Sequence, residues 1–183
     1  MKKIMKKKIN IFCFCATIFF ASSCSENIEI KEQSIGPLFT VCSESFDDYS
    51  KNNVIIDSLA AELKKINFVP ENTFEIIYNR EDDTKRHSIV GCVLPLKIGS
   101  DSTLAITLER NRFNVRTIGF TNCITIEVPM KKFNSQTRGE VLAHFDSYAM
   151  QHNYQLFPDG KNGLTEIYYP DKVLFALEIK SNL

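Results

Sequence analysis

A carboxylate and an aromatic ring two positions apart mark the part of this chain best suited to holding a ligand. In the predicted strand Thr165–Tyr169 (TEIYY), side chains alternate between the two faces, so Glu166 and Tyr168 share one face and Ile167 points to the other. Ile167 suits the face that helices cover, and we expect Glu166 and Tyr168 to line an open cleft on the opposite face. A carboxylate with an aromatic neighbour in a concave site suits an organic cation.

Two more predicted strands contribute to this site. Phe74–Tyr78 (FEIIY) carries Glu75 in the same strand position as the glutamate of Thr165–Tyr169. In Cys123–Val128 (CITIEV), alternation sends the isoleucines to the core and Thr125 to the cleft side. The expected ligand-binding residues are therefore Glu166, Tyr168, Glu75 and Thr125. The alternative is that such a glutamate is a solvated residue on the wet face of a sheet.

Other chemistries find little support in the sequence. His144 and His152 lie two turns apart on one predicted helix, and no cysteine or carboxylate completes a ligand set at a recognised spacing. The chain contains no G-x-S-x-G motif, no glycine-rich phosphate loop and no pairing of a serine or cysteine with histidine. Neither a metal nor a cofactor is expected, and the pattern favours a binding protein over an enzyme.

The N-terminal end has the pattern of an exported lipoprotein. Residues 1–10 carry five lysines and no acidic residue, and a short apolar run, Ile11–Ala21, follows. The run has about half the roughly 20 residues that a membrane-spanning helix needs. Ala21-Ser22-Ser23-Cys24 resembles a lipobox, with alanine where that motif most often has leucine. We expect a signal peptide at 1–23, lipidation at Cys24, and a lipidated N-terminus and tether over 24–35.

The expected location is the cell envelope, outside the cytoplasm, with the outer membrane favoured over the inner one. After removal of the signal peptide, the chain carries five more acidic than basic residues. No basic patch remains that could neutralise a phosphate backbone, so a nucleic acid is not an expected partner. The expected partners are a small-molecule ligand and, through the anchor, the membrane; a protein partner in the envelope stays open.

Three cysteines remain in the body of the chain, Cys42, Cys92 and Cys123, and each lies in a predicted strand. Their spacing matches no metal motif, and buried small hydrophobic residues are the favoured interpretation. One disulfide between neighbouring strands remains an alternative in an oxidising compartment.

Hydrophobic spacing predicts two copies of one β-α-β-β unit. The predicted elements are a strand, a helix and two strands at 38–43, 54–66, 74–78 and 89–94, and again at 123–128, 137–152, 165–169 and 173–179. A proline-containing break follows each helix, and the tetrapeptides EIIY and EIYY then align. We expect repeat one at about 36–96, repeat two at about 123–180 and a connecting segment near 97–122. Together they predict one α+β domain over 36–183, with an antiparallel sheet or barrel, helices on one side and a central cleft.

The second repeat resembles the GyrI-like small-molecule-binding family, the effector-binding domains of some bacterial regulators. The resemblance rests on ITIEVP at 124–129, the helix at 137–152 and LTEIYYPD at 164–171. It implies a duplicated β-α-β-β fold whose cleft takes flat, often cationic organic molecules. It also implies that the glutamate of the EIY strand, here Glu166, meets the cation while aromatic residues enclose the ligand.

Three functional interpretations follow from the resemblance. The favoured one is an exported lipoprotein that binds a small organic molecule, with organic cations as the leading class, in a cleft between two repeats. The second is a hydrolase of reactive small molecules that uses the cleft glutamate as a base. The third is a protein-interaction lipoprotein whose cleft is vestigial and filled by its own side chains.

Overall fold

The computed structural model describes residues 28–46, 51–78, 87–95, 102–156 and 163–181. The predicted signal peptide and Cys24 lie outside these ranges. The elements in chain order are β1 (Ile30–Ser45), α1 (Asn52–Lys65), β2 (Asn72–Tyr78), β3 (His87–Leu94), α3 (Ser102–Arg110), β4 (Asn114–Pro129), the 3-10 turn η2 (Met130–Lys132), α4 (Thr137–His152), β5 (Tyr154–Leu156), β6 (Leu164–Tyr168) and β7 (Lys172–Ser181). None of the helices within these ranges is long and apolar enough to span a membrane.

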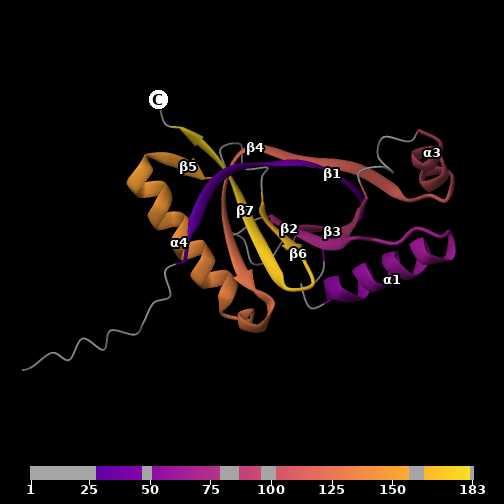
Figure 1. Ribbon diagram of the computed structural model, residues 1–183, viewed down its shortest axis with the longest axis horizontal. Coiled ribbons are helices and arrows are strands. Elements are labelled where there is room, and N and C mark those ends of the chain that lie inside the picture. Colours follow the sequence, from indigo (N-terminus) through magenta and orange to yellow (C-terminus); the bar gives the residue numbers. More distant parts are fainter. Residues whose placement is uncertain (1–27, 47–50, 79–86, 96–101, 157–162, 182–183) are drawn as a thin grey trace, which may run out of the picture.

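All strands pair antiparallel in one sheet of order β4-β1-β3-β2-β6-β7-β5. A further pairing of β4 with β7 closes six of the strands into a ring, and β5 extends the sheet from β7. Figure 1 shows α1 and α4 towards opposite ends of the molecule with strands between them. The α+β class and the ring of antiparallel strands predicted from the sequence are confirmed.

Both long helices cover the same face of the sheet. One cross-strand row joins Cys92, Thr73, Tyr168, Val173 and Val128, and cross-strand partners project to the same side. At one end of this row Cys92 packs in the cluster that includes α1 residues, and at the other Val173 packs in the cluster that includes α4 residues. This confirms the prediction of helices on one side.

The strand pairings repeat between the two halves. In the first half β3 lies between β1 and β2, and in the second half β7 lies between β4 and β6. The row Ser43–Val90–Glu75 corresponds to the row Ile126–Phe175–Glu166. β1 and β4, each 16 residues long, therefore correspond over nearly their whole length, with an offset of one residue at their ends.

The predicted starts of both repeats were too late. Residues 30–35, predicted as part of a tether, belong to β1, and residues 114–122, predicted as a connection, belong to β4. The first half of β1 pairs with β4 but not with β3, and most of it is solvent-exposed. Its polar composition therefore suits an outlying strand as well as a tether. The predicted connecting segment also contains α3, which the sequence analysis missed.

The two long helices agree with prediction and end in a defined way. α4 spans the predicted 137–152 and stops where Asn153 adopts a left-handed conformation with φ of 55°. α1 begins two residues before the predicted start and is followed by Asn67, whose φ is 63°. Asparagine tolerates this backbone region better than most residues, which makes it a common helix stop.

The cysteines of the body are free and buried. Cys42 lies opposite Gly91 on β3, so it and the next β3 residue, Cys92, project to opposite faces of the sheet and cannot form a disulfide. Burial raises the pKa of the Cys92 and Cys123 thiols to about 11. The favoured interpretation, buried small hydrophobic residues, is confirmed.

Candidate functional site

Glu75 and Glu166 face each other in the middle of the sheet. β2 pairs with β6 in a register that makes these two glutamates direct cross-strand partners. They are also equivalent residues of the two repeats, so the pseudo-twofold axis of the domain passes between them. Their side chains are only 5% and 0% exposed. Two like charges at such a position repel unless something neutralises them.

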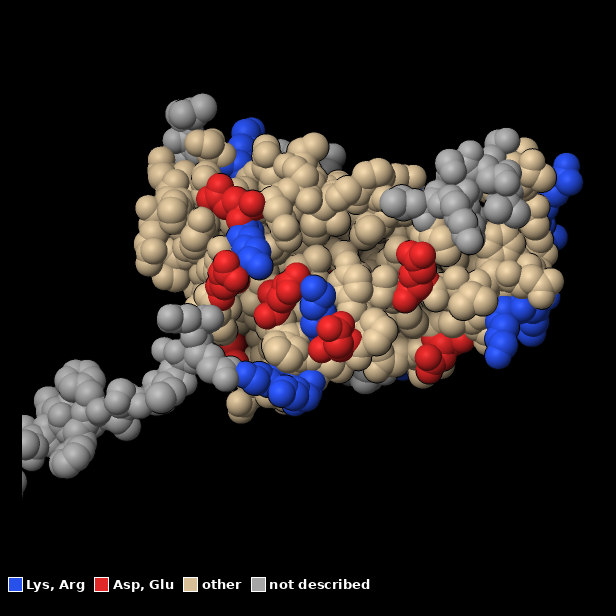
Figure 2. Space-filling model, viewed as in Figure 1, with Lys and Arg blue, Asp and Glu red and all other residues tan. Residues whose placement is uncertain are grey.

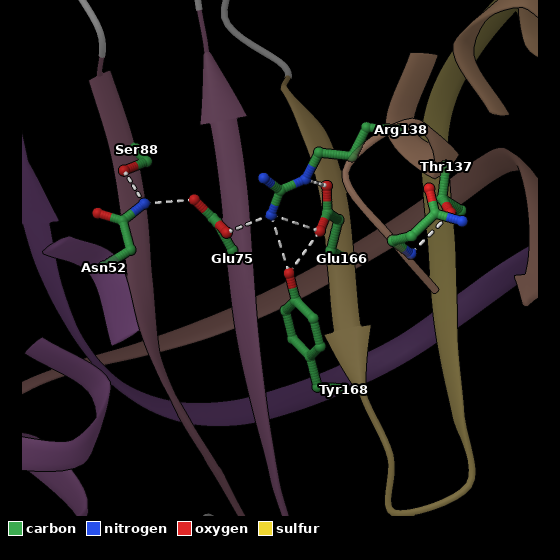
Figure 3. Close-up of polar contacts among 8 residues, drawn as sticks. Asn52, Glu75, Ser88, Thr137, Arg138, Glu166 and Tyr168 are labelled. Atoms are coloured by element: carbon green, nitrogen blue, oxygen red, sulfur yellow. Dashed lines mark hydrogen bonds and ion pairs between the residues drawn. The ribbon is translucent and has the colours of Figure 1, made fainter. Parts of the chain in front are cut away.

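Arg138, the second residue of α4, supplies the neutralising charge. Its Nε and Nη2 donate to the two carboxylate oxygens of Glu166 at 2.6 and 2.9 Å, and Nη2 also donates to Oε2 of Glu75 at 2.9 Å. Nη2 lies 3.0 Å from the Tyr168 hydroxyl, which donates to Glu166 at 2.5 Å. Figure 3 shows the guanidinium set between the two carboxylates, with the Tyr168 ring below.

α1 holds the other side of Glu75. Asn52, the first residue of α1, donates through its amide nitrogen to Oε1 of Glu75 and to the Ser88 hydroxyl, the latter at 3.0 Å. Asn52 is almost fully buried, and its Oδ1 has no hydrogen-bond partner. Glu75 is thus held between a neutral amide from one helix and a guanidinium from the other (Figure 3).

The two helices present different residues at matching positions. The buried residues Asn52 and Ile56 of α1 match Thr137 and Val141 of α4, which makes Asn53 the counterpart of Arg138. Asn53 is exposed and carries no charge. Within the described residues, one guanidinium therefore serves two symmetry-related carboxylates, and the N-terminal ends of both helices add a favourable potential for negative charge.

The electrostatics of the cluster follow from its burial. Burial raises the pKa of Glu75, and the charge of Glu166 raises it further, while Arg138 and the Asn52 hydrogen bond oppose the shift. Burial and the neighbouring Glu166 raise the pKa of Tyr168, so its hydroxyl keeps its proton. Burial lowers the pKa of Arg138, but the hydrogen bond and charge of Glu166 outweigh it and raise the value above normal.

The structure brings three of the four predicted site residues together, but not on the predicted face. Glu166 and Tyr168 point to the face that α1 and α4 cover, and Ile167 points away from the helices into another apolar cluster. The prediction that the helices cover the Ile167 face was wrong. Alternation correctly separated Glu166 from Ile167, but it cannot say which face the helices choose, because both faces of β6 are buried.

Thr125 does not join this cluster. It belongs to the row Thr125–Ala176–Thr165, adjacent to the Glu166 row, and so projects to the opposite face. Its hydroxyl accepts from Gln33 at 2.9 Å and donates to the Lys31 carbonyl at 3.2 Å, so it ties β4 to β1.

Two hollows in the structure lie away from the glutamate pair. One, of about 370 Å³, is lined by residues of β1, β4, β5 and β7, and the other, of about 200 Å³, lies between β2, β3 and β4. Neither is lined by Glu75 or Glu166. The space beside these carboxylates is occupied by Arg138 instead. Within the described ranges, no group of histidine, cysteine and acidic residues could hold a metal.

Arg138 and Asn52 were missed because they lie on helices predicted to be structural. Arg138 is three residues before Val141 and seven before Phe145, both buried, so it borders the apolar stripe of α4. A lone arginine beside such a stripe, on a helix packed over a strand glutamate, is the signal that could have identified it.

Comparisons with solved structures support the fold. The C-terminal domain of EcmrR has a TM-score of 0.60 and 11% identity, covering 85% of this chain and 99% of that one. A hydrolase from Listeria innocua has a TM-score of 0.56 and 9% identity, covering 84% and 92%. EcmrR bound to DNA has a TM-score of 0.59 and 10% identity over 84% of this chain, which spans 57% of that protein.

No protein-family model matches the sequence, and a search of curated proteins finds no significant match. The likeness therefore rests on architecture. This chain has the duplicated β-α-β-β fold of GyrI-like domains.

Proposed function

We propose that this domain binds a small organic cation at the pair of glutamates, Glu75 and Glu166, with the ring of Tyr168 as one wall of the site. The observation that supports this is the imbalance of charge. Two carboxylates that are almost fully buried share one guanidinium. When both are ionised, the cluster keeps an excess negative charge in a partly dry setting, where a cation gains more than at an exposed surface.

The position of the pair also suits a ligand site. It lies on the axis between two repeats, with the first turn of a helix on each side, so that groups from four elements (β2, β6, α1 and α4) converge on one point. A few polar groups that converge on one point are a common feature of small-molecule binding sites. The aromatic ring of Tyr168 adds a face against which a flat cation can pack.

A thermal-shift screen of the full-length chain against flat and quaternary organic cations tests the proposal. Binding should raise Tm in a concentration-dependent way, by linkage to the folded state. Glu166→Gln keeps the shape and removes the charge, so it should weaken binding of the best cation by about tenfold or more. Each variant is compared with its own ligand-free Tm, because Glu166→Gln also changes stability.

The matched control is Glu127→Gln. Glu127 lies on β4 and pairs with Lys172 at 2.8 Å on the surface, with 45% of its side chain exposed. Its substitution should leave ligand affinity unchanged. If no cation binds, or if binding is indifferent to Glu166→Gln, the cation proposal fails, and the filling of the site by Arg138 supports the protein-interaction alternative.

A hydrolase is the second candidate, and one observation favours it. Glu75 has a pKa raised by burial, and a carboxylate with a raised pKa is suited to general acid–base work near neutral pH. Both oxygens of Glu75 accept hydrogen bonds, from Asn52 and Arg138, so a substrate would have to displace one of these donors before Glu75 could act as the base. Hydrolysis of an ester or epoxide by the unsubstituted protein that is lost in Glu75→Gln would support this function. Equal rates of hydrolysis by the unsubstituted protein and Glu75→Gln would exclude it.

We further propose that the protein is an exported lipoprotein, cut before Cys24 and anchored there in the cell envelope, with the outer membrane favoured. The support is the basic, apolar and Ala-Ser-Ser-Cys order of residues 1–24. A stable anchor needs more than one lipid chain, which bacterial lipoproteins carry. The ligand site would then face the compartment outside the cytoplasm.

A further inference from the structure

We infer that Arg138 is an internal cation that occupies the ligand position, and that the ligand which displaces it carries a planar amidinium or guanidinium group. This inference rests on the proposed function and specifies it. The guanidinium already makes the contacts that a bound cation would make. It meets Glu166 through two parallel hydrogen bonds and reaches Glu75 and the Tyr168 hydroxyl with the same Nη2.

The geometry selects the class of cation. Both oxygens of Glu166 accept N–H groups, at 2.6 and 2.9 Å, in the side-by-side arrangement that a planar fork of donors provides. An amidinium has the same fork and can replace the guanidinium bond for bond. A quaternary ammonium has no N–H donor and could not replace the hydrogen bonds that Arg138 makes to the two buried carboxylates, which costs binding free energy.

The exposure of the three side chains shows how a ligand would enter. The Arg138 side chain is 33% exposed, whereas the carboxylates of Glu75 and Glu166 are 5% and 0% exposed. The arginine therefore lies between the acidic pair and the solvent, and it comes from the first turn of α4. A ligand reaches the carboxylates by taking its place, after which the arginine side chain can turn into solvent without unfolding the helix.

The asymmetry of the repeats supports this role. Only one of the two helices supplies a cation to the pair of equivalent glutamates, because the counterpart of Arg138 on α1 is the neutral, exposed Asn53. The pair thus has one arginine that can leave. A ligand can bind only when the Arg138 side chain has turned away from the glutamates. If that conformation is a minor population, the apparent affinity for the external cation is reduced by the fraction of molecules that adopt it.

Chemical rescue of the full-length chain tests the inference. In Arg138→Ala, benzamidine or ethylguanidinium at millimolar concentration should restore much of the lost Tm, and benzamidine should bind at least about tenfold more tightly than to the unsubstituted protein. Tetramethylammonium at the same concentration should restore little. Arg138→Gln keeps most of the stem and removes the charge, so it serves if the alanine variant does not fold.

Arg116→Ala is the matched control. Arg116 pairs with Glu44 at 2.7 Å, but both side chains are well exposed, at 38% and 40%. Neither benzamidine nor ethylguanidinium should raise the Tm of this variant more than it raises the Tm of the unsubstituted protein. Equal affinity for benzamidine with and without Arg138, or equal rescue by tetramethylammonium, would overturn the inference while leaving Glu166-dependent cation binding intact. Absence of any Glu166-dependent binding in either form would instead remove the proposed function.

Discussion

Glu75 and Glu166 are equivalent residues of two repeats and also direct cross-strand partners, so the symmetry axis of the domain passes between two buried carboxylates. The protein breaks the symmetry at the first turn of its helices, where α4 supplies Arg138 and α1 supplies the amide of Asn52. The acidic pair is therefore a buried charged site between the two repeats, with unlike partners from the two helices.

The stability of the fold should depend on Glu166 far more than on a surface glutamate. Glu166→Gln breaks a two-bond contact with Arg138 in a site where the glutamate is fully buried. Loss of one partner from such a contact costs about 2–3 kcal/mol, which for a domain of this size lowers Tm by about 5–10 °C. Thermal unfolding followed by circular dichroism measures the change.

Glu127→Gln is the comparison for that measurement. The Glu127–Lys172 pair is solvent-exposed, and such pairs contribute about 0–1 kcal/mol. Equal losses of Tm in the two variants would mean that the buried cluster adds nothing beyond a surface pair.

Stability should fall as the pH rises through the titration of Glu75. Because burial raises the pKa of Glu75 above its ordinary value of 4.5, the folded state holds this proton more tightly than the unfolded chain does. The stabilisation from the bound proton is complete below pH 4.5 and disappears once the pH exceeds the raised value of the folded protein. Glu75→Gln should therefore gain Tm relative to the unsubstituted protein as the pH rises above 4.5.

The glutamine can be accommodated because Asn52 has an unpartnered Oδ1. If the Asn52 amide turns over, this oxygen accepts from the new amide nitrogen while the glutamine oxygen still accepts from Arg138. If the difference in Tm between Glu75→Gln and the unsubstituted protein does not change with pH above 4.5, the predicted effect of Glu75 titration on stability is wrong.

Two glycines should respond to alanine in opposite directions. A Cβ at Gly91, in the middle of β3, would lie 2.2 Å from the Val41 carbonyl oxygen, so Gly91→Ala must push β1 away from β3. Such overpacking costs about 1–3 kcal/mol. A Cβ at Gly139, in the first turn of α4, meets nothing within 4 Å, and Gly139→Ala should stabilise by up to about 1 kcal/mol. Chemical denaturation of both variants provides the test, and a stable Gly91→Ala would contradict the close contact of these strands.

The thiols of the body should be unreactive while the protein is folded. Cys42, Cys92 and Cys123 are each at most 2% exposed, and burial raises the pKa of all three. A thiolate is needed for alkylation, so these cysteines should remain unmodified by iodoacetamide at pH 7.5 and react only in denaturant. Intact mass spectrometry counts the modified thiols, and rapid modification of the native protein would contradict the packing of the strands.

The anchor is tested separately at Cys24. Mass spectrometry of the membrane fraction should show a chain that begins at Cys24 and carries lipid, and Cys24→Ser should leave an uncleaved precursor. An unmodified, uncut N-terminus in the membrane fraction would refute the lipoprotein proposal.

Local sequence patterns determined the elements and their repetition. The apolar stripe of residues 137–152 predicts a helix that the structure contains with the same bounds, and the alternation in 123–128 correctly sends the isoleucines to the core. The tetrapeptides EIIY and EIYY identify the equivalent glutamates. These features are local because helix and strand periodicities are set by residues a few positions apart.

The tertiary structure decided which face of the sheet became the site and what fills it. β6 is buried on both faces, so alternation separates Glu166 from Ile167 without telling which of them meets the helices. Arg138 reaches both glutamates only because the tertiary fold brings the first turn of α4 close to β6 and β2, and its contact with Glu75 spans 63 residues of sequence. No periodicity in the sequence predicts such a long-range contact. For that reason the two glutamates could be predicted from the sequence, whereas the arginine that neutralises them could not.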